Sequence, residues 1–432
     1  MAKNIDPKPR KIGEYLKLEK DAIFVVPEYQ RAYTWGIDQC DKLWDNIREY
    51  HDSLSKTEEK DAYFFGTVII NCENGDKELA LIDGQQRTTT FLLLLKALLL
   101  RINRALLNTN PEGDSAGLFR GLKARRIAIM SILYGAKPED ISDLPNDEED
   151  RELCKHAIVL ENHSINEQYR NDEGETDLVP ILKSLSLEEA RSAVFTIKYK
   201  RGDNRYTNFF RNFNYFYNIA SKLSESQIND ITATILESCE VIEIKSWNVE
   251  QAIAMFNSLN ADGLPLEDSD IISAQLYASA KSIDGETEYS NSWRELKKGI
   301  EELESKNVAD INSILMQQMY YQRAKDKEIL SDTGEADVTT PGLRKYFTKE
   351  KRGRELLRRP IELCDELKNT VKLWGVVSNY PSVQVLLKFN ENSKLFLASY
   401  LHRFKDTVTE AEIKDIAESL LKLFAILELS DA

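Results

Sequence analysis

The hydrophobic positions near the N-terminus change from strand spacing to helix spacing within a few residues. Residues 23–36 (IFVVPEYQRAYTWG) begin as an apolar, β-branched run, which predicts a strand. Pro27 has no backbone N–H to donate, so the strand is expected to end there or to lie at a sheet edge. Residues 37–50 then place apolar side chains three and four positions apart, which predicts an amphipathic helix.

A second group of apolar runs predicts a hairpin followed by a long helix. Residues 63–71 (YFFGTVIIN) and 78–83 (ELALID) have the composition of strands. Asn74-Gly75 between them is typical of a tight hairpin turn. The apolar stretch that follows predicts a helix over 88–107, so we expect an α/β unit at the N-terminus.

Helical spacing dominates the rest of the chain. A segment rich in Pro, Gly and Asn at 109–119 interrupts the pattern, and residues 240–247 (EVIEIKSW) alternate as a strand does. We therefore predict an α+β fold, in which a small mixed α/β N-terminal domain precedes a mainly α-helical region. The expected regions are 1–110, an α/β unit; 111–285, mostly helical, with the strand near 240–247 completing a cleft; and 286–432, α-helical.

Composition limits the cellular setting. The 432 residues carry a formal net charge of −15, so nucleic-acid binding would need a local basic patch. The five cysteines are scattered and form no CxxC pair, which fits a reducing cytoplasm and gives no indication of a zinc ribbon. The N-terminus lacks the apolar core of a signal peptide, and the longest apolar stretch, Phe91–Leu100, is too short to span a membrane. We expect a cytoplasmic protein without a membrane partner.

The residues between the second hairpin strand and the long helix have the chemistry of a phosphate site. A helix N-terminus offers backbone N–H groups and a partial positive charge, and Gly84 lets a ligand approach the backbone. Arg87 has a planar fork that matches phosphate oxygens, and Gln85 and Gln86 can donate to phosphate or position a water. Asp83 can hold a metal such as Mg²⁺.

A structural interpretation of the same residues has equal weight. Asp83 would cap the helix, Gly84 would form the turn, and Arg87 would pair with a nearby carboxylate. Both interpretations stay open on chemistry alone. In the first, Thr88 joins the nucleotide-binding candidates because it also lies at the helix start.

A second cluster, 27–35 (PEYQRAYTW), combines aromatic rings with an amide and a guanidinium. Tyr33 and Trp35 alternate as core residues of a strand do, so we assign them to packing. The other candidates can face a ligand, because rings stack on bases and polar groups cost free energy when buried unpaired. They are Tyr29, Gln30 and Arg31.

A third cluster, 256–270 (FNSLNADGLPLEDSD), favours a structural interpretation. Its Asn, Gly, Asp and Ser residues explain a helix end, a turn and the cap of the next helix. Asn257 and Asn260 stay candidates for contact with a nucleotide.

Three basic stretches are candidates for contact with DNA: 120–126 (RGLKARR), 198–211 (KYKRGDNRYTNFFR) and 344–359 (RKYFTKEKRGRELLRR). An exposed helix face is the structural alternative for each. The last stretch has the densest charge, with eight Lys or Arg against two Glu. Its DNA-binding candidates are Arg344, Lys345, Lys349, Lys351, Arg352 and Arg354.

Four motifs occur in an order that resembles the N-terminal domain of GmrSD-type restriction systems: PEYQRAYTW, FFGTVII, LIDGQQRTTT and FNSLNADGLPLEDSD. The resemblance implies a ParB/sulfiredoxin-like N-terminal fold. It also implies that the DGQQR loop binds and hydrolyses a nucleoside triphosphate, usually with a divalent metal, in bacterial anti-phage defence. By position, Asp83, Gln85, Gln86 and Arg87 would carry the nucleotide chemistry, and the YQR residues 29–31 would line the same cleft.

The resemblance further implies sensing of modified DNA, with cutting by a C-terminal His-Asn-His nuclease domain. The chain has four histidines, and none lies in such a motif near the C-terminus. Nuclease activity is therefore not expected from this chain alone, and a domain or subunit supplied elsewhere would cut the DNA.

The expected function is hydrolysis of GTP or ATP with Mg²⁺, coupled to sensing of double-stranded, modified DNA in a restriction system. The alternative is a non-hydrolysing nucleotide- or DNA-binding regulatory or scaffold protein. A homo-oligomer is compatible with the sequence, which does not determine the oligomeric state.

Overall fold

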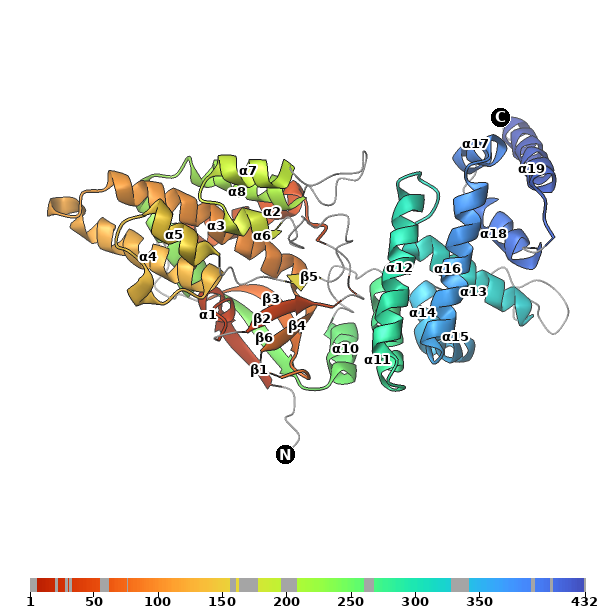
Figure 1. The fold of residues 1–432 in the computed structure, drawn as a ribbon, viewed down its shortest axis with the longest axis horizontal. Coiled ribbons are helices and arrows are strands. Elements are labelled where there is room, and N and C mark those ends of the chain that lie inside the picture. Colours follow the sequence, from red (N-terminus) through yellow and green to blue (C-terminus); the bar gives the residue numbers. More distant parts are fainter. Residues whose placement is uncertain are drawn as a thin grey trace. The chain divides into compact units, whose positions relative to one another are not determined.

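A computed structural model of the chain divides into two compact units, Met1–Leu259 and Asn260–Ala432. Figure 1 shows the helices and strands of each unit. The structure describes residues 6–19, 22–27, 30, 33–54, 62–75, 77–155, 161–162, 178–195, 208–259, 268–327, 342–389, 393–404 and 407–430.

One mixed sheet is the centre of the first unit. Its described strands are β1 (Asp6–Lys11), β2 (Ile23–Val26), β3 (Tyr63–Asn71), β4 (Glu78–Asp83), β5 (Glu161–Asn162) and β6 (Cys239–Ser246). Their order is β1-β6-β3-β4-β2-β5. β1 pairs with β6 and β3 with β4 in antiparallel fashion, and the other neighbours are parallel.

The hairpin expected from sequence joins β3 and β4. These strands have the predicted bounds, and Gly75 in the turn has a φ of 105°, a backbone conformation that favours glycine. The predicted strand near 240–247 is β6, which lies between β1 and β3. Part of the second predicted region therefore belongs to the same sheet as the N-terminal strands.

Ten α-helices accompany the sheet in the described part of the first unit. They are α1 (Ile12–Tyr15), α2 (Ile37–Leu54), α3 (Gln85–Asn108), α4 (Ala116–Tyr134), α5 (Asp147–Cys154), α6 (Leu178–Lys183), α7 (Leu187–Phe195), α8 (Asn208–Ala220), α9 (Glu225–Glu237) and α10 (Val249–Leu259). Short 3-10 turns occupy Gly113–Ser115 and Pro138–Asp140.

The helix α3 lies at the middle of the apolar core. It packs against α4, α8 and α9, and every residue of Phe91–Leu100 is buried. A helix that is apolar on every face is stable in water only when neighbours cover every face. This explains why the most hydrophobic stretch of the chain is an interior helix, while α10 packs separately against β3, β4 and β6.

Every regular element in the described part of the second unit is a helix. The unit contains α11 (Asp268–Lys281), α12 (Glu286–Glu304), α13 (Ile311–Lys325), α14 (Leu343–Lys349), α15 (Lys351–Leu357), α16 (Pro360–Val377), α17 (Pro381–Phe389), α18 (Ser393–Phe404) and α19 (Glu410–Ser430). Its own core includes the buried rings of Trp293 and Trp374. The Trp374 indole donates to Gln317 Oε1 at 2.7 Å, which satisfies the buried N–H.

The predicted α+β fold is confirmed: a mixed sheet near the N-terminus precedes mostly helical structure. The closer likeness to ParB and sulfiredoxin stays a prediction, as does the division at 110 and 285. No helix in the described part of the chain is both long and apolar enough to cross a bilayer.

Candidate functional site

The turn between β4 and α3 depends on a glycine. Gly84 is the N-cap of α3, with φ 90° and ψ 2° in the left-handed region. A Cβ at this position would lie 2.8 Å from Cγ2 of Val68, which is closer than real Cβ contacts. Gly84 is therefore required by its backbone angle and by the closeness of β3, and it leaves the N-cap without a side chain.

The first turn of α3 holds the segment that carries the second cluster. Gln86 is buried, and its Oε1 accepts hydrogen bonds from the backbone N–H of Thr34 at 2.8 Å and of Trp35 at 3.1 Å. Gln85 beside it is also buried. The Gln86 side chain therefore replaces strand pairing for a stretch that follows Pro27 and is no longer in the sheet.

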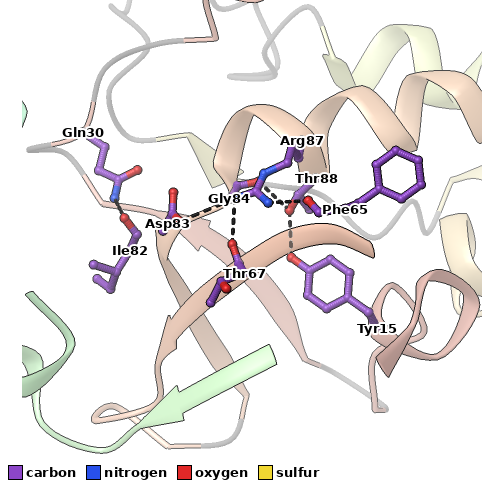
Figure 2. A network of polar contacts seen from close by, with 9 residues as sticks. All are labelled: Tyr15, Gln30, Phe65, Thr67, Ile82, Asp83, Gly84, Arg87 and Thr88. Atoms are coloured by element: carbon purple, nitrogen blue, oxygen red, sulfur yellow. Dashed lines mark hydrogen bonds and ion pairs between the residues drawn. The ribbon is translucent and has the colours of Figure 1, made fainter. Parts of the chain in front are cut away.

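Gln30 forms the reciprocal tie. Its Nε2 donates to the carbonyl oxygen of Ile82 at 2.5 Å, one residue before the end of β4 (Figure 2). The cluster 27–35 and the β4–α3 turn, about 50 positions apart in the sequence, are thus in direct contact. Tyr29 and Arg31 lie outside the described residues, so their predicted place in the cleft stays a prediction.

Arg87 binds backbone carbonyls of the neighbouring strand. Its Nη1 donates to the Phe65 oxygen at 2.5 Å and its Nη2 to the Thr67 oxygen at 2.6 Å (Figure 2). The same Nη2 lies 3.4 Å from Oδ2 of Asp83. The side chains of Arg87 and Asp83 remain 22% and 23% exposed, so both can still be reached from solvent.

Hydroxyl groups form a layer beneath the first turn. Thr88 donates to the Gly84 carbonyl at 2.9 Å and accepts from the Tyr15 hydroxyl at 2.7 Å (Figure 2). Thr90 accepts from the Tyr33 hydroxyl at 2.7 Å. Burial raises the pKa of both phenols well above the usual value, so both stay neutral donors. Thr88, a predicted nucleotide ligand, is buried and has its hydroxyl in this layer.

Two asparagines of α8 complete the support, and the sequence did not mark them. Asn212 donates from Nδ2 to the Tyr33 hydroxyl and to the Trp35 carbonyl, each at 2.8 Å. Asn208 donates to the Thr34 carbonyl at 3.4 Å. The sequence does contain a signal: these two buried amides are four residues apart in a helix that is rich in aromatic residues. Tyr33 is buried and stacks on Phe209, as the packing assignment predicts.

In the third cluster, Asp268 takes part in packing within the second unit. Asp268 starts α11 and lies 3.0 Å from Nε of Arg344, and its other oxygen accepts from the Arg344 backbone N–H at 3.3 Å. Asn257 lies near the end of α10, and Asn260 lies outside the described residues. Contact of these two asparagines with a nucleotide stays a prediction.

The basic stretches differ in how their charges are used. In 120–126, Lys123 pairs with Asp143, Arg125 with Glu237, and Arg126 with Asp150. These charges are therefore compensated inside the first unit. Most of 198–211 lies outside the described residues.

The stretch 344–359 forms α14 and α15 and exposes more charge than it pairs. Arg344 pairs with Asp268, and Arg352 lies 2.8 Å from Glu355 and 3.7 Å from Asp326. Five other basic side chains are exposed and have no acidic partner among the described residues. They are Lys345, Lys349, Lys351, Arg354 and Arg358.

Comparison with known families gives a match over most of the first unit. Residues 12–277 match a family described as GmrSD restriction endonuclease, N-terminal domain. The match covers more than half of the chain, including the β4–α3 turn, β3 and the segment held by Gln86. No curated protein matches the chain.

Proposed function

Because the chain belongs to the family of GmrSD restriction endonuclease N-terminal domains, we propose that its first unit is a nucleotide-dependent module of such a system. Membership implies a part in a GmrSD-type restriction system, with DNA as the target and a partner nuclease domain. The proposal adds that the start of α3 binds a nucleoside triphosphate, GTP or ATP, and hydrolyses it.

The observation that carries this proposal is the start of α3, which has a glycine at the N-cap and carries the partial positive charge of a helix N-terminus. Gly84 provides no capping side chain, and the first turn of this 24-residue helix contains no acidic residue. The N–H groups of a first helical turn lack intrahelical partners and carry a partial positive charge, which favours phosphate. An N-cap without a side chain also leaves room for phosphate oxygens to approach the backbone.

Asp83 suits a metal ion that arrives with the nucleotide. No group of three or more His, Cys, Asp or Glu side chains in the described residues could hold a metal by itself. Mg²⁺ is usually bound by one or two carboxylates together with substrate phosphates and water. Asp83 ends β4 beside Gly84 and is partly exposed, so it supplies one such carboxylate, and the ion would neutralise charge on the phosphates.

Phosphate release by the purified chain tests the nucleotide proposal. With GTP or ATP and Mg²⁺, Asp83→Asn should lower the rate by about 100-fold, the scale for losing one electrostatic group in an active site. The control is Asp114→Asn, which changes an exposed aspartate in a 3-10 turn and should leave the rate unchanged. Nucleotide binding without turnover would support the non-hydrolysing regulatory alternative. Equal rates for the two variants would remove Asp83 from the chemistry.

The exposed charge on α14 and α15 favours a second role for the chain. We propose that Lys345, Lys349, Lys351, Arg354 and Arg358 contact the phosphate backbone of double-stranded DNA. Unpaired cations bind DNA by releasing counterions from it, and this contact carries no sequence information. Recognition of a modified base, and hand-over to a nuclease, would then require further contacts.

A further inference from the structure

The strand β3 contains an irregularity directly beside the first turn of α3. Its register against β6 shifts between Phe64 and Thr67. Gly66 lies within this shift and has a φ of 91°, which residues with a side chain rarely adopt. The carbonyls of the two residues that flank Gly66, Phe65 and Thr67, accept hydrogen bonds from the Arg87 guanidinium (Figure 2).

Gly66 leaves room for that guanidinium. A Cβ at position 66 would lie 2.1 Å from Nη1 of Arg87 and 3.3 Å from its Cζ. Any other residue at position 66 would therefore have to displace Nη1 of the guanidinium, which is the nitrogen that donates to the Phe65 carbonyl. The glycine of the FFGT motif and the arginine of the DGQQR motif fit each other as one contact, although 21 positions separate them in the sequence.

We infer that Gly66 and Arg87 form a single positioning unit for the proposed nucleotide site, an inference that rests on the proposed function. Both terminal nitrogens of the guanidinium donate to the carbonyls of Phe65 and Thr67. Its role is therefore to hold the first turn of α3 and the Asp83 carboxylate against β3. Binding of phosphate falls instead to the helix N-terminus. The distance of 3.4 Å to Asp83 Oδ2 places this carboxylate within reach of the same group.

This assignment predicts how substitutions divide between kcat and KM. Arg87→Ala and Gly66→Ala should each lower kcat by about 100-fold, the scale for a misplaced catalytic group, and leave the KM for nucleotide nearly unchanged. Arg87→Lys should resemble Arg87→Ala, because an ammonium cannot donate to both carbonyls as a planar fork does. An arginine that bound phosphate directly would raise KM when removed, and lysine would restore part of the binding.

A double-mutant cycle on the full chain tests the contact itself. Gly66→Ala should lower the urea midpoint strongly in the wild-type background and less in the Arg87→Ala background, because the clash is then gone. Gly75→Ala is the matched control: Gly75 has a similar φ of 105° and nothing within 4 Å of an added Cβ. Gly75→Ala should lower the midpoint equally in both backgrounds.

The two measurements separate the possible failures. If the wild-type chain releases no phosphate, the proposed function fails, and the urea cycle still decides whether positions 66 and 87 act together. If phosphate is released but Gly66→Ala behaves as Gly75→Ala does, the positioning unit is wrong. An increase in KM with unchanged kcat in Arg87→Ala would make Arg87 a phosphate ligand and would also overturn the inference.

Discussion

At the scale of single residues, the polar side chains of the motifs act first as ties within the protein. Gln86 accepts from two backbone N–H groups, Gln30 donates to Ile82, and Arg87 donates to two carbonyls. Polar groups buried without a partner cost about 1–3 kcal/mol each, so a site built at the edge of a core must satisfy them internally.

A buried lysine in α3 also has a hydrogen-bond partner inside the protein. Lys96 is fully buried, and its Nζ donates to the Tyr134 hydroxyl at 2.6 Å, which itself donates to the Leu182 carbonyl at 2.7 Å. Burial lowers the pKa of Lys96 from 10.5 to about 8, and the nearby Cys154, Asp150 and Glu189 oppose this effect only in part.

Lys96 should therefore make stability depend on pH. Its pKa is lower in the folded state, so the unfolded chain binds more protons between about pH 8 and 10.5, and the free energy of unfolding rises with pH across that window. Lys96→Met should remove this rise and stabilise the protein near pH 7, by up to about 3 kcal/mol. Urea unfolding at several pH values measures both effects.

The control for this prediction is an exposed lysine. Lys137→Met should keep the pH dependence of the wild type, because Lys137 is exposed. Parallel curves for Lys96→Met and the wild type would show that the amine of Lys96 is not responsible.

At the scale of elements, two short helices make the basic surface of the second unit. α14 and α15 are in close contact at Gly353 and Tyr346. A Cβ on Gly353 would lie 2.1 Å from the backbone carbonyl oxygen of Tyr346. The buried rings of Tyr346 and Phe347 anchor α14 in the core. The close packing of α14 and α15 therefore fixes the positions of the two helices that carry the basic side chains.

Replacing the five exposed basic residues, Lys345, Lys349, Lys351, Arg354 and Arg358, with Gln should weaken binding of double-stranded DNA. The slope of log affinity against log salt should become shallower by about 0.9 for each phosphate that the protein no longer neutralises. Fluorescence anisotropy of a labelled duplex over a range of KCl concentrations measures the slope. The matched control replaces Lys123 and Arg125, whose charges are already paired, and should leave the slope unchanged. An unchanged slope in the five-fold variant would exclude this surface.

At the scale of the whole molecule, two apolar cores are built from separate parts of the chain. The first surrounds α3 and includes the strands of the sheet, and the second surrounds Trp293 and Trp374. The family match begins in α1 and ends in α11, so it includes all described strands after β1. The contribution of each core to stability can therefore be measured with a cavity-forming substitution in that core.

Separate cores predict separate responses to substitution. Leu94→Ala and Leu386→Ala, both at fully buried positions, should each destabilise their own unit by about 2–5 kcal/mol. The other unit should change by less than about 0.5 kcal/mol, because the substituted side chain packs in a separate core. Urea unfolding followed by far-UV circular dichroism and tryptophan fluorescence resolves the transitions. A single transition that both variants shift equally would contradict two independent cores.

The sequence by itself determined the local structure and the kind of chemistry. Strands β3 and β4, the helix α2 and the hairpin turn at Asn74-Gly75 follow from spacing and turn residues, because these act between near neighbours. The motifs also identified the family before any tertiary contact was known. The same local rules left the function of Arg87 open between phosphate binding and an internal bond.

Only the tertiary structure decided which partner each polar group takes. The bonds of Arg87 to β3, of Gln86 to residues 34 and 35, and of Asn212 to Tyr33 join positions 20 to 179 residues apart. The order of the strands and the packing of α8 against α3 bring these positions together, and no local pattern encodes either. The same holds for charge: Lys123, Arg125 and Arg126 are paired and part of 344–359 is not, because the acids that reach the first three lie elsewhere in the chain.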